Sequence, residues 1–264
     1  MKSNLPIGIF DSGIGGLTVA NAVKKVLPNE SILYFGDTEH LPYGEKSVEA
    51  IQQFSKRITE FLINKGCKLI VIACNTASSV ANNIVTKTAQ DLPVINVIDP
   101  VIKHLAKHCQ NCDIGVIGTK GTINSQVYPK KLHLLNTKVN VNSLATPLLA
   151  PMIEEGFFND QLSQTVIDSY LSNPQLTGID KLILACTHYP LIQEAIQKYY
   201  QGKVDIIDSA SQVAETVKVL LEKNSLLSNQ AAKHQFFVSD FTDSFEKSAK
   251  VFFHEEIHLE EIKL

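Results

Sequence analysis

Short apolar runs rich in valine and isoleucine recur along this chain, and helical periodicity follows most of them. In the first part of the chain such runs lie at residues 7–10, 31–35, 68–73 and 94–97. Their length and β-branched content predict buried strands of a parallel sheet. Apolar positions spaced three and four apart predict helices over 17–27, from Ser47 to about 62, and over 78–88.

The same alternation starts again after Asp99-Pro100. Strands are predicted at 114–117, 139–144, 182–185, 204–207 and 236–238, and helices at 161–171 and after the capping pair Asp208-Ser209. Two motifs recur about 110 residues apart, which indicates an internal duplication: residues 114–122 echo 7–15, and the Cys186 strand echoes the Cys74 strand. The chain is therefore expected to form an α/β fold of two similar halves packed with a cleft between them.

The composition narrows the class of protein. The chain has 264 residues, 44% of them hydrophobic and 19% charged, which is typical of a globular protein of one or two domains. A net charge of −3 gives no electrostatic reason to expect nucleic acid or an anionic membrane as a partner. No apolar run approaches the ~20 residues that cross a bilayer. The run ending at Asp11 is too short for a signal peptide, and five cysteines in such a chain indicate the reducing cytoplasm rather than a disulfide framework.

Two cysteines stand out because each follows a predicted strand. The sequence places Asn75-Thr76 after Cys74, and Thr187-His188 after Cys186. A lone cysteine at such a position is more often a small buried hydrophobe than a nucleophile. The carboxyl ends of parallel strands nevertheless line the crevice where open α/β sheets bind ligands, and buried polar groups are costly without a task. The pair therefore favours a site with one thiol from each half.

Two thiols across a cleft suit the inversion of a carbon centre, because a base must take a proton from one face while an acid returns one to the other. Thiols ionise near pH 8.5, so one thiol and one thiolate can coexist with modest tuning. Asp11 is expected beside Cys74 if the third strand pairs with the first, and His188 can assist Cys186. Arg57 is the only arginine, so carboxylates of a substrate would be held by Ser12, Asn75, Thr76, Thr187 and loop amides.

Two other motifs give weaker evidence about function. The loop at residues 13–16 has Gly13 and Gly15, but Thr18 occupies the third glycine position of a dinucleotide fingerprint, so that pattern fails. Its amides at a helix start can still receive an anion such as a carboxylate. Cys109 and Cys112 have C-x-x-C spacing, yet no second such pair exists to complete a structural zinc site. His104 and His108 precede them in a segment that resembles an exposed helix end.

Taken together, six motifs in one order resemble the cofactor-independent aspartate/glutamate racemase family of bacteria, in its glutamate branch. The resemblance covers nearly the whole chain. The motifs are residues 8–17, 34–37, Pro42-Tyr43-Gly44, 73–77, 153–156 and Cys186-Thr187-His188-Tyr189-Pro190. It implies two flavodoxin-like, doubly wound α/β domains related by a pseudo-twofold axis, with the active site between them and neither pyridoxal phosphate nor metal. The expected boundaries are 1–98 completed by 208–264 for the first domain, and 99–207 for the second.

The resemblance also implies roles for individual residues. Cys74 is expected to deprotonate D-glutamate and Cys186 L-glutamate, with Asp11 and His188 assisting those thiols and Glu154 as a further contributor. Substrate contacts carry over onto a larger set: Asp11, Ser12, Tyr43, Gly44, Asn75, Thr76, Thr119, Thr122, Thr187 and His188. The implied product, D-glutamate, feeds peptidoglycan synthesis, and a homodimer is expected.

Some features leave alternatives open. Ala185 stands where the family usually has glycine, and its methyl group is expected to shift the Cys186 backbone slightly. Aspartate racemases typically carry glutamate at the position of His188, which favours glutamate over aspartate as substrate. Single-cysteine decarboxylases of malonates are disfavoured because both cysteines are present. A binding protein that kept the fold without catalysis is a further alternative, against which the two intact cysteines argue. Only ten residues precede Asp11, so dependence on a peptidoglycan-precursor activator is not expected.

Overall fold

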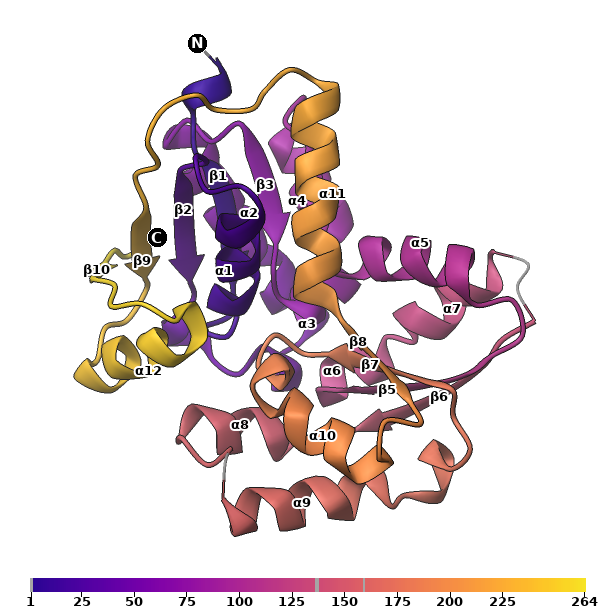
Figure 1. Ribbon diagram of the computed structural model, residues 1–264. Helices are drawn as coiled ribbons and strands as arrows, with labels where there is room; N and C mark the ends of the chain where they lie inside the picture. Colours follow the sequence, from indigo (N-terminus) through magenta and orange to yellow (C-terminus); the bar gives the residue numbers. More distant parts are fainter. Residues whose placement is uncertain (1, 136–137, 159) are drawn as a thin grey trace.

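A computed structural model describes residues 2–135, 138–158 and 160–264 of the chain (Figure 1). It contains two fully parallel sheets. The six-stranded sheet has the order β10-β9-β2-β1-β3-β4, and the four-stranded sheet has the order β6-β5-β7-β8. The strands of the first sheet are β1 (Ile7–Asp11), β2 (Ile32–Gly36), β3 (Leu69–Ile72), β4 (Val94–Asn96), β9 (Gln235–Val238) and β10 (Leu259–Glu261). Those of the second are β5 (Asp113–Gly118), β6 (Asn140–Ala145), β7 (Lys181–Ala185) and β8 (Asp205–Asp208).

The two sheets share one strand plan. Strands β2-β1-β3-β4 of the first correspond in order to β6-β5-β7-β8 of the second. In the first sheet, β3 pairs with β1 and ends two residues before Cys74. In the second sheet, β7 pairs with β5 and ends one residue before Cys186. The predicted fold class, two similar parallel-sheet α/β domains, is therefore confirmed. The first sheet also takes β9 and β10 from the end of the chain, although the exact domain boundaries stay a prediction.

Helices cover both sheets. Those from the first part of the chain are α1 (Leu17–Val26), α2 (Val48–Asn64), α3 (Asn75–Val80), α4 (Asn82–Ala89) and α5 (Ile98–His108). The middle part contributes α6 (Lys120–Asn124), α7 (Val127–His133), α8 (Leu149–Glu154), α9 (Gln161–Leu171) and α10 (Gln193–Tyr200). Helices α11 (Ser209–Lys223) and α12 (Asp243–Phe253) follow, and short 3₁₀ turns include η2 (Thr38–His40), η3 (Tyr43–Glu45) and η5 (Tyr189–Ile192). None of the described helices is long and apolar enough to cross a membrane.

Helix α11 joins the two halves. It leaves β8 in the second sheet and runs back along the first, where it packs against α1 and α5 (Figure 1). Its apolar residues Val213, Val217 and Leu221 are fully buried. They belong to one continuous apolar cluster that contains residues of both sheets. The other face of the first sheet has its own cluster under α2 and α4. The halves are thus packed through a shared core rather than tethered by a linker.

Capping residues explain several helix starts. As predicted, the Ser47 side chain accepts a hydrogen bond at the start of α2, and Asp208 does the same for α11. The predicted helix over 78–88 is wrong in its start and continuity, because α3 begins at Asn75 and α4 follows after a break at Ala81. The reason is that the Cys74 sulfur serves as the N-cap of α3, accepting from the Ala77 amide at 3.4 Å. Sequence patterns give little weight to a thiol as a cap.

A buried ion pair stabilises the first sheet near the start of β3, at the end opposite to Cys74. Lys68 Nζ lies 2.5 Å from Glu30 Oε2, and both side chains are 2% exposed. Lys68 also donates to the carbonyls of Ser3 and Leu226, while Glu30 accepts from the Ser228 amide. One lysine thus ties together the start of β3, the turn before β2 and the segment after α11.

The five cysteines divide into two groups. Cys67, Cys74 and Cys186 are free and buried. Cys109 and Cys112 form a disulfide. Their spacing of three places the two side chains side by side between the end of α5 and the start of β5. Within the described residues, no group of three or more His, Cys, Asp and Glu side chains is placed to hold a metal ion.

Candidate active site

The first thiol sits where the first sheet ends. Cys74 follows β3, and Asp11 is the last residue of the neighbouring strand β1, so the two are adjacent as predicted. Cys74 is 5% exposed, and its sulfur lies 3.8 Å from Ser12 Oγ. Burial, and then the negative charge of Asp11, raise the pKa of the Cys74 thiol to about 12. This environment therefore favours the protonated thiol.

Asp11 is completely buried, with one carboxylate oxygen in use and one free. Its Oδ2 accepts from the Gly16 amide at 2.8 Å, whereas Oδ1 has no hydrogen-bond partner among the described residues. Burial raises the pKa of this carboxyl, and the positive charge of His188 and the Gly16 amide only partly offset it. Oδ1 is therefore the oxygen of this carboxyl that can still accept a proton or a hydrogen bond.

The second thiol has an imidazole and a carboxylate in line behind it. Cys186 Sγ lies 3.5 Å from His188 Nδ1, and His188 Nε2 lies 2.8 Å from Glu154 Oε1. His188 is buried, with a side chain 6% exposed. Burial lowers its pKa, but the negative charges of Cys186 and Glu154 and their hydrogen bonds outweigh that effect and raise the pKa well above its usual value.

The glycine loop at residues 13–16 serves close packing. A Cβ at Gly15 would lie 2.3 Å from His188 Cε1 and 2.7 Å from Thr187 Oγ1. A Cβ at Gly16 would lie 2.5 Å from Asp11 Cβ. The Gly16 amide at the start of α1 is already bound by Asp11. The anion expected at this helix start is therefore the protein's own carboxylate, and the loop lets His188 approach from the other half.

Hydroxyl groups connect the two halves around the thiols. Thr18 Oγ1 lies 2.9 Å from the carbonyl oxygens of both Gly15 and Thr187, which bridges α1 to the residue after Cys186. On the other side, Thr76 Oγ1 lies 2.9 Å from Thr119 Oγ1 and 3.3 Å from Thr122 Oγ1. Both clusters lie where the ends of the two sheets face each other.

Asn75 is held by a tyrosine from the second half. Its Oδ1 accepts from the Tyr128 hydroxyl at 2.8 Å, which orients the amide and leaves Nδ2 as the free end. Nδ2 is buried and has no hydrogen-bond partner among the described residues. An unpaired buried donor is costly, so this nitrogen is suited to bind an acceptor on a ligand.

Both thiols open onto one small cavity of about 60 Å³. Its walls come from both halves and contain most of the predicted site residues. They are Ser12, Leu41, Pro42, Tyr43, Gly44, Cys74, Asn75, Thr76, Thr119, Ala150, Pro151, Glu154, Ala185, Cys186, Thr187 and His188. Among these described residues there is no lysine or arginine, and Arg57 lies exposed on α2. A space of this size fits a small polar molecule and not a nucleotide.

Two predicted residues do not line the cavity, and several that matter were not predicted. Asp11 and Thr122 sit behind the wall, against Cys74 and Thr76. Thr18 and Tyr128 hold wall residues in place, and neither has a signal in the sequence that distinguishes it from core. Asp37 directly follows β2, one residue beyond the position that corresponds to Asp11 at the end of β1, and this place at a strand end was the available signal for it.

Ala185, the departure from the family pattern, is accommodated by its neighbour. Its register partner on β5 is Gly118, where a Cβ would lie 3.3 Å from the Ala185 Cβ and 2.9 Å from its carbonyl oxygen. Ala73 occupies the equivalent place before Cys74. Both cysteines thus follow an alanine, and the absent side chain at Gly118 leaves room for the methyl group.

Two similar halves thus contribute one thiol each to the lining of one small cavity. A family model described as Asp/Glu/Hydantoin racemase matches residues 17–217. The chain belongs to this family of isomerases. The glutamate racemase of Geobacter metallireducens is 41% identical to it over 241 residues, which is 90% of this chain and 89% of that protein.

Solved structures agree. The glutamate racemase of Francisella tularensis, crystallised in complex with D-glutamate, has a TM-score of 0.92 at 40% identity and covers 99% of this chain and 98% of its own. A glutamate racemase isoform from Bacillus anthracis has a TM-score of 0.94 at 38% identity, with the same coverage.

Proposed function

We propose that this protein is a glutamate racemase that interconverts L- and D-glutamate with Cys74 and Cys186 as its two bases. The observation that carries the proposal is the shared cavity, into which each half directs one thiol with its own assisting group. The relatives named above are glutamate racemases, and their similarity to this chain extends over nearly their whole length. This supports glutamate as the substrate.

In the direction from L to D, the Cys186 thiolate removes the Cα proton from one face of L-glutamate. The Cα–H bond breaks, an S–H bond forms, and the electron pair is left on a carbanion conjugated with the α-carboxylate. The Cys74 thiol then gives its proton to the opposite face, and its S–H bond becomes a thiolate. The reverse direction uses the same groups in exchanged roles. Each turnover therefore leaves the two sulfurs in exchanged protonation states.

The residues around the two thiols support this assignment. A raised pKa keeps Cys74 protonated as the acid, and His188 Nδ1 lies 3.5 Å from the Cys186 sulfur, within reach of its proton. In the opposite direction we propose that Asp11, whose Oδ1 has no hydrogen-bond partner among the described residues, takes the Cys74 proton. Both assisting roles follow the principle that a base is activated by a nearby group that holds its proton.

Binding of the substrate is proposed to depend on neutral donors. Asn75 lines the cavity and its Nδ2 has no hydrogen-bond partner among the described residues, while the hydroxyl-bearing residues Ser12, Thr76, Thr119 and Thr187 line the same cavity. Thr122 supports this cluster from behind, and the loop with Tyr43 and Gly44 closes one side. Hydroxyl and amide donors can bind a carboxylate without a cationic side chain.

The wider setting of the reaction rests on the family resemblance. We propose that D-glutamate made here supplies peptidoglycan synthesis in the cytoplasm, that the reaction needs no pyridoxal phosphate or metal, and that the protein works as a homodimer. The last point is tested by light scattering of the purified protein.

The test of the proposed function measures inversion and proton exchange together. Purified protein is incubated with D- or L-glutamate in D2O without pyridoxal phosphate, and circular dichroism and Cα deuterium are followed. Cys74→Ser and Cys186→Ser should each lower kcat/KM about 100- to 10,000-fold. Cys67→Ser is the matched control, because Cys67 is a free, buried thiol outside the cavity. It should remain active.

Three results would contradict the proposal in different ways. Racemisation of aspartate with glutamate unchanged would leave the family intact and change the substrate. Inactivity with both amino acids under reducing conditions would favour a binding protein. Equal losses in all three cysteine variants, with unchanged melting temperatures, would remove the special role of Cys74 and Cys186.

A further inference from the structure

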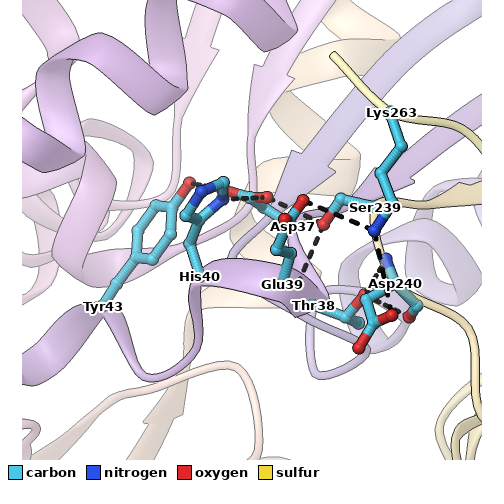
Figure 2. A network of polar contacts seen from close by, with 8 residues as sticks. All are labelled: Asp37, Thr38, Glu39, His40, Tyr43, Ser239, Asp240 and Lys263. Carbon is cyan, nitrogen blue, oxygen red and sulfur yellow. Dashed lines mark hydrogen bonds and ion pairs between the residues drawn. The ribbon is translucent and has the colours of Figure 1, made fainter.

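A buried carboxylate beside the cavity collects three hydrogen bonds. Asp37 follows β2 and is 3% exposed. Its Oδ2 accepts from the Tyr43 hydroxyl at 2.6 Å, and its Oδ1 accepts from Ser239 Oγ and His40 Nδ1, both at 2.8 Å. Figure 2 shows Tyr43 and His40 on one side of this carboxylate and Ser239 on the other. None of these contacts takes part in the proton transfers proposed above.

These contacts attach the loop that follows β2, residues 37–44, to the segment that follows β9. Ser239 Oγ also accepts from the Glu39 amide at 2.9 Å, and Thr38 Oγ1 both donates to the Asp240 carbonyl and accepts from its amide. These bonds connect the segment after β2 with the segment after β9 (Figure 2). The exposed Lys263 lies 3.8 Å from the Asp240 carboxylate, a surface pair of little consequence. The buried bonds therefore carry the attachment.

The far side of the same loop forms a wall of the cavity. Tyr43 and Gly44 both line it, and Tyr43 is 1% exposed. Burial, followed by the charge of Asp37, raises the pKa of Tyr43 far above its usual value, so its hydroxyl stays protonated and donates to Asp37. This hydroxyl is therefore committed to the protein. Only the ring and backbone of Tyr43 are left to face a substrate.

The loop after β2 is tightly packed where it meets the second half. A Cβ at Gly44 would lie 2.9 Å from Thr119 Cβ, and one at Gly121 would lie 3.2 Å from the Gly44 carbonyl oxygen. His40 is stacked on Phe54 with ring centroids 3.9 Å apart, which holds the other end. A small shift of the loop would thus change the distance between the two walls of the cavity.

We propose that Asp37 is a positioning residue that sets the substrate-binding wall at Tyr43 and Gly44 by holding the Tyr43 hydroxyl and anchoring it to Ser239. The inference rests on the proposed racemase function, which it extends to a residue outside the cavity. Asp37 does not touch the reacting atoms, so its effect is expected on substrate binding and not on the rate of proton transfer.

The test compares isosteric variants. Asp37→Asn replaces one acceptor oxygen with a donor, and Tyr43→Phe removes only the hydroxyl. Each should raise KM for both enantiomers about 10- to 100-fold, the value of a hydrogen bond to a charged group, and leave kcat within about threefold. The double variant should be no worse than Asp37→Asn alone, because both changes remove one shared contact. Asp240→Asn is the matched control and should keep the wild-type KM.

A purely structural role predicts a different outcome. If Asp37→Asn lowers the melting temperature while KM stays unchanged, or if the two single effects multiply in the double variant, the inference is overturned. Tyr43→Phe keeps the packing of the ring and serves where Asp37→Asn does not fold.

Titration calorimetry with D-glutamate separates this inference from the proposed function. If the wild type binds D-glutamate without racemising it, the proposed function fails, and weaker binding by Asp37→Asn than by Asp240→Asn would still support the positioning role. No binding by the wild type would overturn both.

Discussion

The close approach of Gly15 to His188 makes an alanine at this position a sharp test of the thiol–imidazole pair. The new Cβ would lie 2.3 Å from His188 Cε1 and 2.6 Å from its Nδ1. His188 cannot move away freely, because Glu154 holds Nε2 at 2.8 Å and the Phe252 ring packs edge-on against it at 5.3 Å. The contact between Nδ1 and Cys186, at 3.5 Å, is the one expected to break.

The size of the effect follows from the bond that is lost. A hydrogen bond to a charged group is worth about 1.5–3 kcal/mol, so Gly15→Ala should lower kcat/KM about 10- to 100-fold. Because L- and D-glutamate are equal in free energy, kcat/KM must fall equally in both directions, which provides an internal check. Initial rates from circular dichroism with each enantiomer measure it.

Gly13→Ala is the matched control within the same loop. A Cβ there would meet the flexible end of Leu41 at 3.1 Å, a contact that can adjust. Its kcat/KM should stay within about threefold of wild type. If Gly15→Ala were equally mild, or if both variants lost activity together with their melting temperature, the reasoning about His188 would be refuted.

Three further results are expected. Lys68→Met leaves the buried Glu30 carboxylate unpaired and should lower the free energy of unfolding, measured in urea, by about 3–5 kcal/mol. Lys181→Met, which breaks a surface ion pair, should lower it by less than about 1 kcal/mol. Equal losses would contradict this expectation. Burial raises the pKa of Cys67 to about 12. The contribution of this thiol to stability is therefore complete below pH ~8.5 and falls by about 1.4 kcal/mol per pH unit towards pH 12. Cys67→Ser should lose less stability than wild type between pH 9 and 11, and parallel losses would be inconsistent with a raised pKa. Tyr128→Phe frees the Asn75 amide and should raise KM about tenfold; an unchanged KM with a lower melting temperature would show that the tyrosine only stabilises the fold.

The sequence was informative wherever a side chain's neighbours follow from strand order. Cys74 and Asp11 meet because β3 pairs with β1, and the apolar runs already predicted these strands. Cys186 and His188 are two residues apart, so their contact needs only a turn after β7. The site residues that strand order alone could predict are those at strand ends, whereas Tyr43, Gly44, Glu154 and Thr122 were expected only from the family resemblance.

The remaining contacts depend on packing between distant segments. Asp37 meets Ser239 about two hundred residues further along the chain, and Tyr128 reaches Asn75 from a helix of the other half. The role of Gly15 depends on how close His188 comes, which is a distance between halves that no periodicity encodes. Single hydroxyl groups and missing side chains leave no pattern in a sequence.

The attachment of the loop to Ser239 has a consequence for when the protein first becomes active. Strands β9 and β10 are synthesised after all the other strands described, yet they complete a sheet whose centre is made first. Until Ser239 has left the ribosome, Asp37 lacks one of its donors and the wall at Tyr43 lacks its anchor. A nascent chain can thus contain both thiols and the whole second sheet and still bind substrate weakly. We therefore expect tight substrate binding only once the segment that contains Ser239 has left the ribosome.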